Sequence, residues 1–418
     1  MRRRHVVICG SGVIGLSAAY YLLERGHRVT IVERGGPDHD CCSLGNAGFI
    51  SPSHFVPLAA PGVVRKAIGW MGNPESPFYV HPRVDPGLIS WMIRFWRASS
   101  RARAERAGPL LRDLTLASRS LFEELAERTG NPFGLAREGL LLLLRSERGL
   151  EEERELAIRS RELGMPAEVL DASGVRALEP GVTFDVRGGV LYPLDAHLIP
   201  RQLMETLTRL VAERGGAFVW DAEVVDWKRY RSTVSAAMTS KGEIEGEEFV
   251  ICAGSWTPAL ARRLGVRLSM QPGKGYSLTL GRPRELPRHS IILQEARVAL
   301  TPMGGSLRVA GTMELAGYDL RINPPRIRGM TRSLSTYLPA FRQEDFRDVV
   351  PWCGLRPCTP DGLPYVGRVR GWENVIVASG HAMMGVSLGP ITGMLVSEIV
   401  SEDPPSVDLS GLAVGRFG

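Results

Sequence analysis

The first residues of the chain alternate between short apolar runs and a helical repeat of apolar side chains. Val6 to Cys9 is an apolar run without a breaker, as in a buried parallel strand. Leu16 to Arg25 then repeats apolar side chains at the spacing of one helical face, and Gly26 ends this repeat. Val29 to Val32 is a second apolar run. The pattern predicts a strand, a helix and a second, parallel strand.

The turn between the first strand and the helix is rich in glycine, and an acid follows the second strand. Gly10, Gly12 and Gly15 have the spacing of a dinucleotide fingerprint, and Glu33 follows 18 residues after Gly15. Such glycines permit the tight turn, the approach of the pyrophosphate to the helix N-terminus and close helix–strand packing. The acid accepts hydrogen bonds from ribose hydroxyls. The residues predicted to bind the dinucleotide here are Gly10, Ser11, Gly12, Val13, Ile14, Gly15, Glu33 and Arg34.

Further along the chain, helical and extended patterns alternate. The spacing predicts helices at about 87–130, 151–163, 195–215 and 389–402. Strands are expected at 139–144, 187–192, 218–220, 223–228, 248–252 and 374–378. From 270 to 350 the strands are separated by Gly/Pro turns, which is typical of an antiparallel sheet.

These patterns predict an α/β protein of two domains. The first is a Rossmann-like FAD-binding domain of the glutathione-reductase type, formed by residues 1–54, 193–260 and 352–418. The second is an α+β substrate domain with a mainly antiparallel sheet, formed by 55–192 and 261–351. FAD is favoured over NAD(P) because glycine-rich strand ends recur at Ala253-Gly254 and at 379–389. One long cofactor that touches three distant segments explains this recurrence.

Composition and charge exclude some classes of function. The chain has 418 residues and a net charge of +6, and only Lys66, Lys228, Lys241 and Lys274 are lysines. The basic residues are dispersed and form no recognised nucleic-acid module, so we expect no nucleic-acid partner. The densest basic stretch, Arg94 to Arg106, lies beside Trp91 and Trp96. It fits a helix packed on the body of the protein, or a peripheral helix at a membrane surface.

The six cysteines predict neither a disulfide scaffold nor a zinc site. They form no CxxC pair and no cluster of cysteine and histidine with metal-ligand spacing. This usage suits a reducing compartment, so we expect a cytoplasmic protein. Peripheral contact with the inner face of the membrane is compatible with that location. Arg2 to Arg4 before an uncharged stretch from Val6 to Leu23 has the outline of a signal peptide. The glycines at turn positions argue against that interpretation.

Seven motifs occur in order along the chain and carry a resemblance to a known family. They are GSGVIGLSAAYYL, SLGNAGFISP, LAAPGV, GKGYSLTL, GTMELAGYD, WCGLRPCTPDGLPYVG and ASGHAMMGVSLGPITG. Together they resemble the D-amino-acid dehydrogenase family, FAD flavoproteins similar to glycine oxidase and sarcosine oxidase. The SLGNAG, GKGYSLT and ELAGYD blocks resemble the dehydrogenase branch more than the oxidases.

The resemblance implies roles for individual residues. In the family, the arginine at the position of Arg356 binds the substrate carboxylate, which a planar guanidinium matches with two hydrogen bonds. His381 is expected to line the flavin or the substrate, and His54 to reach the substrate side. Tyr276 and Tyr318 are candidates for a second contact to the carboxylate or amine. A tyrosine of glycine oxidase is replaced here by Ala299, so the oxidase pocket does not transfer intact.

The remaining cofactor contacts are expected in loops and at strand ends. Neither Cys353 nor Cys358 has the spacing of the cysteine that binds flavin in sarcosine-type enzymes, so we expect non-covalent FAD and no metal. The further residues expected to bind FAD are Ser43, Asn46, Ala47, Gly48, Val224, Ala253, Gly254, Trp256, Gly354, Gly380, Met383 and Gly385.

The implied reaction is oxidative deamination of a D-amino acid to a 2-oxo acid and ammonia. A hydride passes from the α-carbon to the flavin, and the electrons pass on to an acceptor such as a quinone. Two alternatives stay open at this point. One is an oxidase or dehydrogenase for a secondary amine or imino acid, such as glycine, sarcosine, D-proline or hydroxyproline. The other is a flavin-binding subunit of a larger complex. The sequence indicates no oligomeric state.

Overall fold

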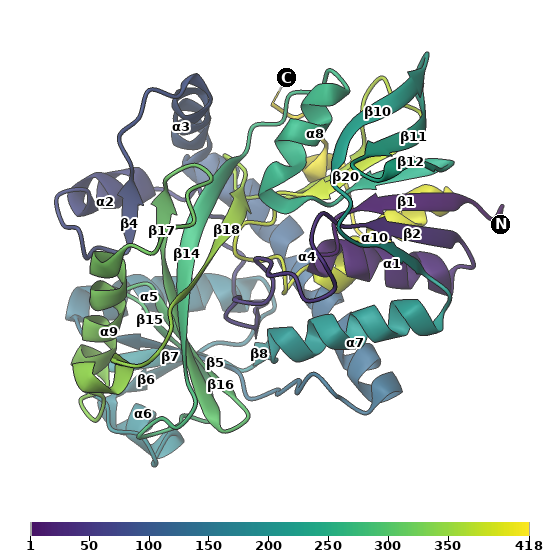
Figure 1. Cartoon of the computed structure of the whole chain (residues 1–418). Coiled ribbons are helices and arrows are strands. Elements are labelled where there is room, and N and C mark those ends of the chain that lie inside the picture. The colour runs from purple at the N-terminus through teal and green to yellow at the C-terminus, as the bar shows by residue number, and fades with distance from the viewer. Residues whose placement is uncertain (1, 418) are drawn as a thin grey trace.

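The computed structural model describes residues 2–417 and divides them between two sheets with their helices (Figure 1). The first sheet has the order β19-β20-β13-β1-β2-β9. Its strands β20, β13, β1, β2 and β9 are parallel, and β19 is antiparallel to β20. Their bounds are β1 His5–Cys9, β2 Arg28–Val32, β9 Ala217–Val219, β13 Glu248–Ile251, β19 Tyr365–Arg368 and β20 Val375–Ser379. Three distant segments of the chain therefore assemble one sheet.

Helices α1 (Val13–Glu24) and α10 (Gly389–Ser401) pack against each other beside this sheet. Their contact is too close for an added side chain at Gly393, where a Cβ would lie 2.5 Å from the backbone of Ser17. Helices α7 (Pro200–Glu213) and α4 (Arg101–Thr129) pack on the same pair. The first and last long helices of the chain are thus direct neighbours in the core.

A smaller antiparallel sheet flanks the first one. It consists of β10 (Val224–Tyr230), β11 (Thr233–Thr239) and β12 (Gly242–Glu245). Helix α8 (Thr257–Arg263) covers it, and the Trp227 indole N–H donates to the Leu260 carbonyl at 3.1 Å.

The second large sheet has nine strands in the order β18-β14-β17-β16-β15-β5-β7-β6, with β4 on β17. Most pairs are antiparallel, but β15–β5 and β17–β4 are parallel. Helix α9 (Pro324–Tyr337) and α6 (Ala172–Leu178) contribute to the apolar core on one face, and α5 (Glu147–Glu162) packs on β5 and β7. The strand bounds are β4 Phe78–Val80, β5 Leu140–Leu144, β6 Glu168–Asp171, β7 Gly188–Tyr192, β14 Gln271–Leu280, β15 Ser290–Leu293, β16 Val298–Met303, β17 Ser306–Leu315 and β18 Trp352–Cys358.

The structure corrects three predicted boundaries. The helix expected over 87–130 is two helices, α3 (Pro86–Ala98) and α4. The helix expected from 195 begins at Pro200, because Ala196–His197 forms strand β8 against β3 (Phe49–Ile50). The FAD-binding segment predicted to start at 352 starts later, because β18 pairs along its whole length with β14 of the substrate domain.

Among residues 2–417, no helix is long and apolar enough to cross a membrane. Helix α2 (Val63–Trp70) and α3 lie together at one end of the molecule, next to β4 and β17 (Figure 1). The core of the FAD-binding domain and the core of the large sheet are separate clusters. The candidate site lies where the two domains meet.

Candidate active site

The carboxyl ends of β1, β13 and β20 bring three predicted glycine segments to one edge of the parallel sheet. Gly10 follows β1, Gly254 follows β13 and Gly380 follows β20, and all three have positive φ. A Cβ on Gly10 would lie 2.7 Å from the Cys252 carbonyl oxygen, and a Cβ on Gly15 would lie 1.9 Å from the Gly10 carbonyl oxygen. Only glycine permits this contact between turn, helix and neighbouring strand.

The N-terminus of α1 is suited to an anion. Gly12 is the N-cap and contributes no capping side chain, while the Ser43 hydroxyl accepts from the Val13 N–H at 3.1 Å. The space beside Gly12 is open, since an added Cβ would meet only the Ser43 hydroxyl, at 3.7 Å. Free N–H groups and the helix dipole favour a phosphate at such a position. This cradle fits the pyrophosphate of FAD.

Glu33 is a buried carboxylate at the end of β2. It accepts hydrogen bonds from the Ser11 N–H at 2.9 Å, the Ser11 hydroxyl at 3.0 Å and the Gly35 N–H at 3.1 Å. His39 lies 3.8 Å away, and its pKa is raised by a hydrogen bond to Cys41 and by the charge of Glu33. The position and charge of Glu33 fit a ribose of FAD. Beside it, the Arg34 guanidinium stacks on the Trp256 ring at 3.7 Å.

The segment from Asp40 to Gly48 is held between the two domains. Asn46 accepts from the Gly48 N–H at 2.8 Å and donates to the Met383 carbonyl at 3.2 Å. From the large sheet, Thr301 donates to the Ala47 carbonyl at 2.7 Å, and Arg308 donates to the carbonyls of Leu44 and Asn46 at 2.8 and 2.9 Å. Burial, together with the charge of Arg201, lowers the pKa of Arg308 to about 10. The expected flavin-contact residues Ser43, Asn46, Ala47 and Gly48 therefore lie at the junction of the domains.

Arg356 lies on the face of the large sheet that looks toward this segment. Its guanidinium crosses Gly275 of β14, where a Cβ would lie 2.2 Å from the guanidinium carbon. It donates to the Thr312 carbonyl at 2.5 Å. Burial lowers the pKa of Arg356, while nearby Cys42 and Cys358 raise it. Cys42 belongs to the segment held between the domains, so Arg356 is next to the expected flavin position.

Within residues 2–417, Arg356 takes part in no ion pair. The partly buried guanidinium donates to the Thr312 carbonyl but has no counter-charge among these residues, and a cation withdrawn from water without a counter-charge is costly. A bound carboxylate would supply the missing charge and two hydrogen-bond acceptors. The arrangement is that of a binding site for an anionic ligand.

Trp352 joins β18 to the loop of the other domain. Its indole N–H donates to Asp40 at 2.6 Å, and its ring lies against Gly45 and Gly354, where added Cβ atoms would come within 2.2 Å of it. Gly354, expected to contact FAD, thus leaves room for this ring. Sequence reasoning missed Trp352, Arg308 and Thr312, since no local motif shows which strands pair or which loop they contact.

His381 is part of the same junction through its backbone. It forms a bridge with Cys358, and the Ala382 N–H donates to the Pro357 carbonyl at 2.9 Å. Its imidazole is buried against α10, with Nε2 2.9 Å from the Thr392 hydroxyl, and burial lowers its pKa to about 3. His381 is therefore neutral near pH 7 and positions the backbone between Gly380 and Gly385. Its neighbour Met383 is partly exposed.

Three other predicted substrate contacts do not come to Arg356. Tyr276 lies in the apolar core on the opposite face of β14, and its hydroxyl donates to Glu314 at 2.8 Å. Tyr318 is half exposed and donates to the Ser255 carbonyl at 3.0 Å, next to Trp256. His54 is partly buried and makes no hydrogen bond to Arg356 among residues 2–417, and burial lowers its pKa to about 4. Val224, an expected FAD contact, is buried at the start of β10.

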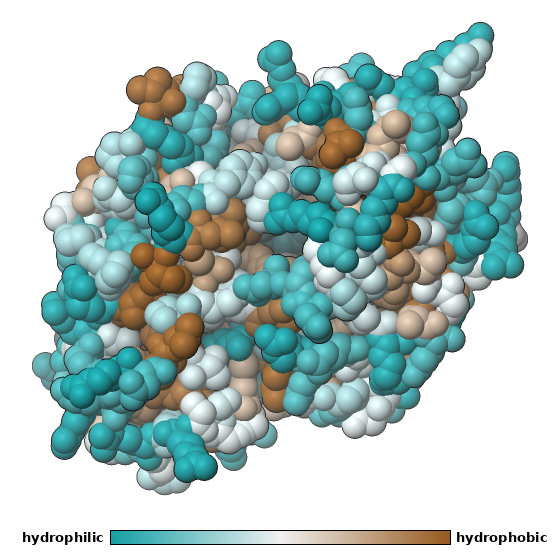
Figure 2. Space-filling model, viewed as in Figure 1, coloured by the Kyte–Doolittle hydropathy of each residue, from teal (hydrophilic) through white to brown (hydrophobic). Residues whose placement is uncertain are grey.

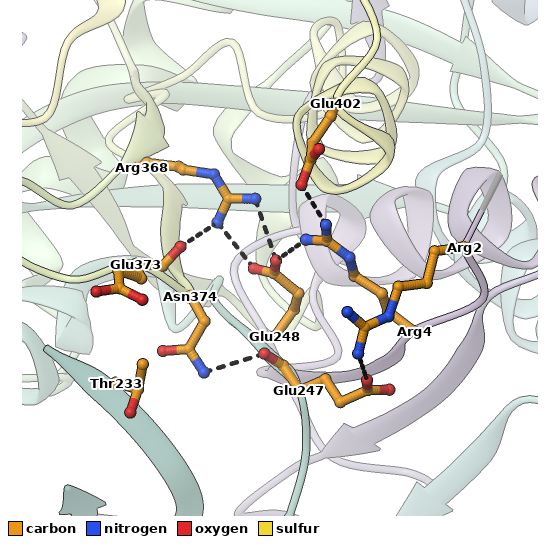
Figure 3. Close-up of a pocket in the computed structure, with 9 residues that line it drawn as sticks. All are labelled: Arg2, Arg4, Thr233, Glu247, Glu248, Arg368, Glu373, Asn374 and Glu402. Atoms are coloured by element: carbon orange, nitrogen blue, oxygen red, sulfur yellow. Dashed lines mark hydrogen bonds and ion pairs between the residues drawn. The ribbon is translucent and has the colours of Figure 1, made fainter. Parts of the chain in front are cut away.

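A second, charged hollow lies at the other end of the parallel strands (Figure 3). There Glu248 is held by Arg4 and Arg368, and Arg4 also pairs with Glu402. Ligands of doubly wound sheets bind at the carboxyl ends of the strands, and this hollow is at the amino ends. Because the charges in this hollow are largely paired with one another, we interpret it as a structural ion-pair network. This network connects the N-terminal strand to the C-terminal part of the chain.

Asp195 is expected to make the stability of the folded protein depend on pH. Its buried carboxylate accepts from the N–H and hydroxyl of Ser53 at 3.0 and 2.6 Å, and burial raises its pKa to about 7. The unfolded chain ionises near pH 4, so the carboxyl stabilises the fold fully below pH 4 and progressively less as the pH rises through 7.

We therefore expect Asp195→Asn to be more stable than the wild type at pH 8, by up to about 4 kcal/mol, and equally stable near pH 4. Asparagine keeps the size and the acceptor for Ser53. Guanidinium unfolding at the two pH values measures the difference, with exposed Asp348→Asn as the control. A stability difference independent of pH would contradict the raised pKa.

Comparisons with known proteins agree with this geometry. Residues 5–399 match the DAO family, described as FAD dependent oxidoreductase. The chain belongs to this family. The FAD-dependent oxidoreductase is 32% identical over 423 residues to D-amino acid dehydrogenase of Granulibacter bethesdensis, covering 99% of both chains. It is 34% identical over 421 residues to D-amino acid dehydrogenase of Methylobacterium nodulans, covering 97% of this chain and 98% of the relative.

Solved structures show the same fold. Glycine oxidase from Geobacillus kaustophilus superposes with a TM-score of 0.79 at 25% identity, covering 100% of this oxidoreductase and 99% of the other chain. L-proline dehydrogenase from P. horikoshii superposes with a TM-score of 0.77 at 16% identity, covering 100% and 98%, a likeness of fold alone. The predicted fold class, the resemblance to the D-amino-acid dehydrogenase family and FAD as cofactor are confirmed.

Proposed function

We propose that this oxidoreductase converts D-amino acids to 2-oxo acids and ammonia. The observation that carries the proposal is Arg356, a partly buried guanidinium without a carboxylate partner among residues 2–417, placed beside the segment expected to contact the flavin. The names of the relatives in the comparisons support the same substrate class. A flavin-binding subunit without amine oxidation has no evident need for a site of this kind.

When bound, FAD supplies the acceptor for the hydride that leaves the α-carbon. The chain's own part is positioning. Arg356 binds the substrate carboxylate through its planar fork, and Gly275 leaves the space in which that fork lies. The loss of a hydride and an amine proton converts the amino acid to an imino acid, which water hydrolyses to the 2-oxo acid and ammonia.

Anaerobic mixing of the FAD-loaded protein with a panel of amines tests this function. We expect D-alanine and other D-amino acids to bleach the flavin absorbance, and their L-enantiomers to leave it unchanged. Glycine and the secondary amines sarcosine, D-proline and hydroxyproline test the alternative substrates, of which the likeness to glycine oxidase favours glycine. Dye reduction and peroxide formation, measured side by side, separate a dehydrogenase from an oxidase. Failure of the D-amino acids to bleach the flavin would overturn the proposal, whether or not the other amines bleach it.

We also propose that α2 and α3 contact an anionic membrane surface, from which a lipid-soluble acceptor such as a quinone reaches the enzyme. The outer face of these helices exposes Ile68, Ile93 and Trp96, and Trp96 is 65% exposed. Apolar side chains are visible at the top left of Figure 2, where α3 lies in Figure 1. The exposed Arg65 of α2 and Arg97 of α3, with Arg103 at the start of the adjoining α4, provide charge complementary to anionic lipids.

The inner face of α3 connects this surface to the site. The Trp91 indole N–H donates to the Cys358 carbonyl at 2.9 Å, two residues from Arg356. Leu88 and Trp91 pack with Met313 and Ala382 in one cluster. An acceptor held at the outer face of α3 would therefore be separated from the site by little more than the helix.

Sedimentation with vesicles tests the membrane contact. We expect binding to vesicles of phosphatidylglycerol and weak binding to phosphatidylcholine. Ile93→Ser with Trp96→Ser should lower the bound fraction several-fold, because two exposed apolar side chains no longer enter the interface. Val350→Ser is the matched control, since Val350 is 86% exposed and lies outside α2 and α3. Equal binding of both variants would exclude this face.

A further inference from the structure

Thr312 has a strained backbone next to Arg356. Its φ is +59°, in the left-handed region. For a β-branched residue this is a genuine outlier, which persists only where the surrounding structure enforces it. Such outliers concentrate at ligand sites, so the strain at Thr312 calls for an explanation from its surroundings.

A β-bulge in β17 creates this conformation. Lys274 pairs with Glu314 and Tyr276 pairs with Gly311, so three steps along β17 oppose two along β14. The extra residue lies at Thr312–Met313, directly across from Gly275. Bulges of this kind redirect side chains, often beside active sites.

The side chain of Thr312 belongs to the face that carries Arg356. Along β17, Leu307 and Val309 lie in the apolar core, so Arg308 and Ala310 face the other domain, and Thr312 continues their alternation. Beyond the bulge, Met313 lies against Gly273 on the face of Arg356, and Glu314 returns to the side of Tyr276. Thr312 is therefore the hydroxyl residue at the tip of the guanidinium, whose Nη1 donates to its carbonyl.

The hydroxyl of Thr312 is buried without a partner. The residue is 6% exposed, and its Oγ1 makes no hydrogen bond within residues 2–417. A buried hydroxyl in this state destabilises the ligand-free protein, since its bond to water is lost and not replaced. A polar ligand atom at the guanidinium would satisfy it. The backbone strain, the burial and the missing hydrogen-bond partner of Thr312 therefore all indicate a ligand-binding position beside the Arg356 guanidinium.

We propose that Thr312 is a substrate-binding residue, whose hydroxyl donates a hydrogen bond to the carboxylate held by Arg356. The proposal rests on the function proposed above and adds a second carboxylate contact, in place of Tyr276 and Tyr318. One carboxylate oxygen then accepts from the guanidinium alone, and the other from both the guanidinium and the hydroxyl. The bulge fixes the hydroxyl at the carboxylate and so restricts the orientation of the α-carbon.

The test uses the FAD-loaded protein and propionate, a carboxylate that lacks the amine and is not oxidised. Propionate binding is followed through the change in flavin absorbance. We expect Thr312→Val to raise the Kd for propionate and the KM for D-alanine by about 10- to 100-fold, because a hydrogen bond to a charged group is lost. Thr312→Ser keeps the hydroxyl and should stay within about threefold of the wild type. All variants should keep their FAD.

Thermal unfolding of the ligand-free protein separates this role from a structural one. Thr312→Val removes an unsatisfied hydroxyl and Thr312→Gly relieves the left-handed strain, so both should melt at or above the wild-type temperature. A structural role predicts the reverse: a lower melting temperature and an unchanged Kd for propionate. Either of those results overturns the proposal.

The two proposals fail in distinguishable ways. If the wild type binds propionate through Thr312 but D-amino acids do not bleach it, the substrate class is wrong and the carboxylate contact stands. If D-amino acids bleach the flavin and Thr312→Val behaves as the wild type, the contact is wrong and the function stands. A wild type that binds no carboxylate overturns both.

Discussion

Replacing Arg356 with alanine is expected to raise the KM for D-amino acids by about 100- to 1,000-fold while FAD stays bound. Loss of one partner from a desolvated charge pair costs about 2–5 kcal/mol, and Arg356 is the partly buried cation that we expect to bind the substrate carboxylate. Steady-state kinetics with dye reduction measures KM, and the flavin absorbance of the purified protein measures cofactor content.

Two matched variants sharpen this prediction. Arg356→Lys keeps the positive charge but loses the planar fork, so its KM should lie between those of the wild type and the alanine variant. Exposed Arg282→Ala changes the net charge equally and should leave KM unchanged. An Arg356→Ala protein with full FAD and an ordinary KM would show that the carboxylate binds elsewhere.

Replacing Gly15 with alanine is expected to abolish FAD binding. The added Cβ would lie 1.9 Å from the Gly10 carbonyl oxygen, a backbone atom that cannot give way without opening the turn. The turn and the first residues of α1 form the cradle for the pyrophosphate, so the cofactor should be lost with them. The variant should purify colourless and melt at a lower temperature than the FAD-free wild type.

Gly69→Ala is the control for the Gly15 variant. Gly69 lies in α2, and an added Cβ there meets nothing within 4 Å. Alanine favours a helix over glycine, so this variant should be as stable as the wild type or slightly more so. A yellow Gly15→Ala protein with normal FAD content would contradict the close packing of turn and helix.

The sequence predicted most accurately the features that depend on neighbouring residues. The strand, glycine turn, helix and acid between His5 and Glu33 all lie within one short segment, so their spacing alone identifies them. The repeated glycines after β13 and β20 were readable for the same reason. Arg356 was predicted from its motif, but its lack of an ion pair became evident only in three dimensions.

The features that depend on strand pairing could not be predicted from the sequence. Tyr276 lies one position from Gly275, and this single step places it in the core and not beside Arg356. The bulge at Thr312 depends on the register of β17 against β14. Similarly, the sequence did not show that β18 belongs to the large sheet. That placement depends on its pairing with β14, which lies more than seventy positions earlier in the chain.

The contact between α1 and α10 has a consequence for biosynthesis. Some 365 residues separate the end of the first helix at Glu24 from the start of the last at Gly389. At a translation rate of about 5–20 residues per second, the ribosome takes about 20 to 70 s to make the intervening chain. During that interval the face of α1 that packs on α10 has no partner, although α7 can already pack on α1. The cofactor domain can therefore finish folding only at the last stage of translation. Until then, we expect chaperones to bind the exposed apolar face of α1.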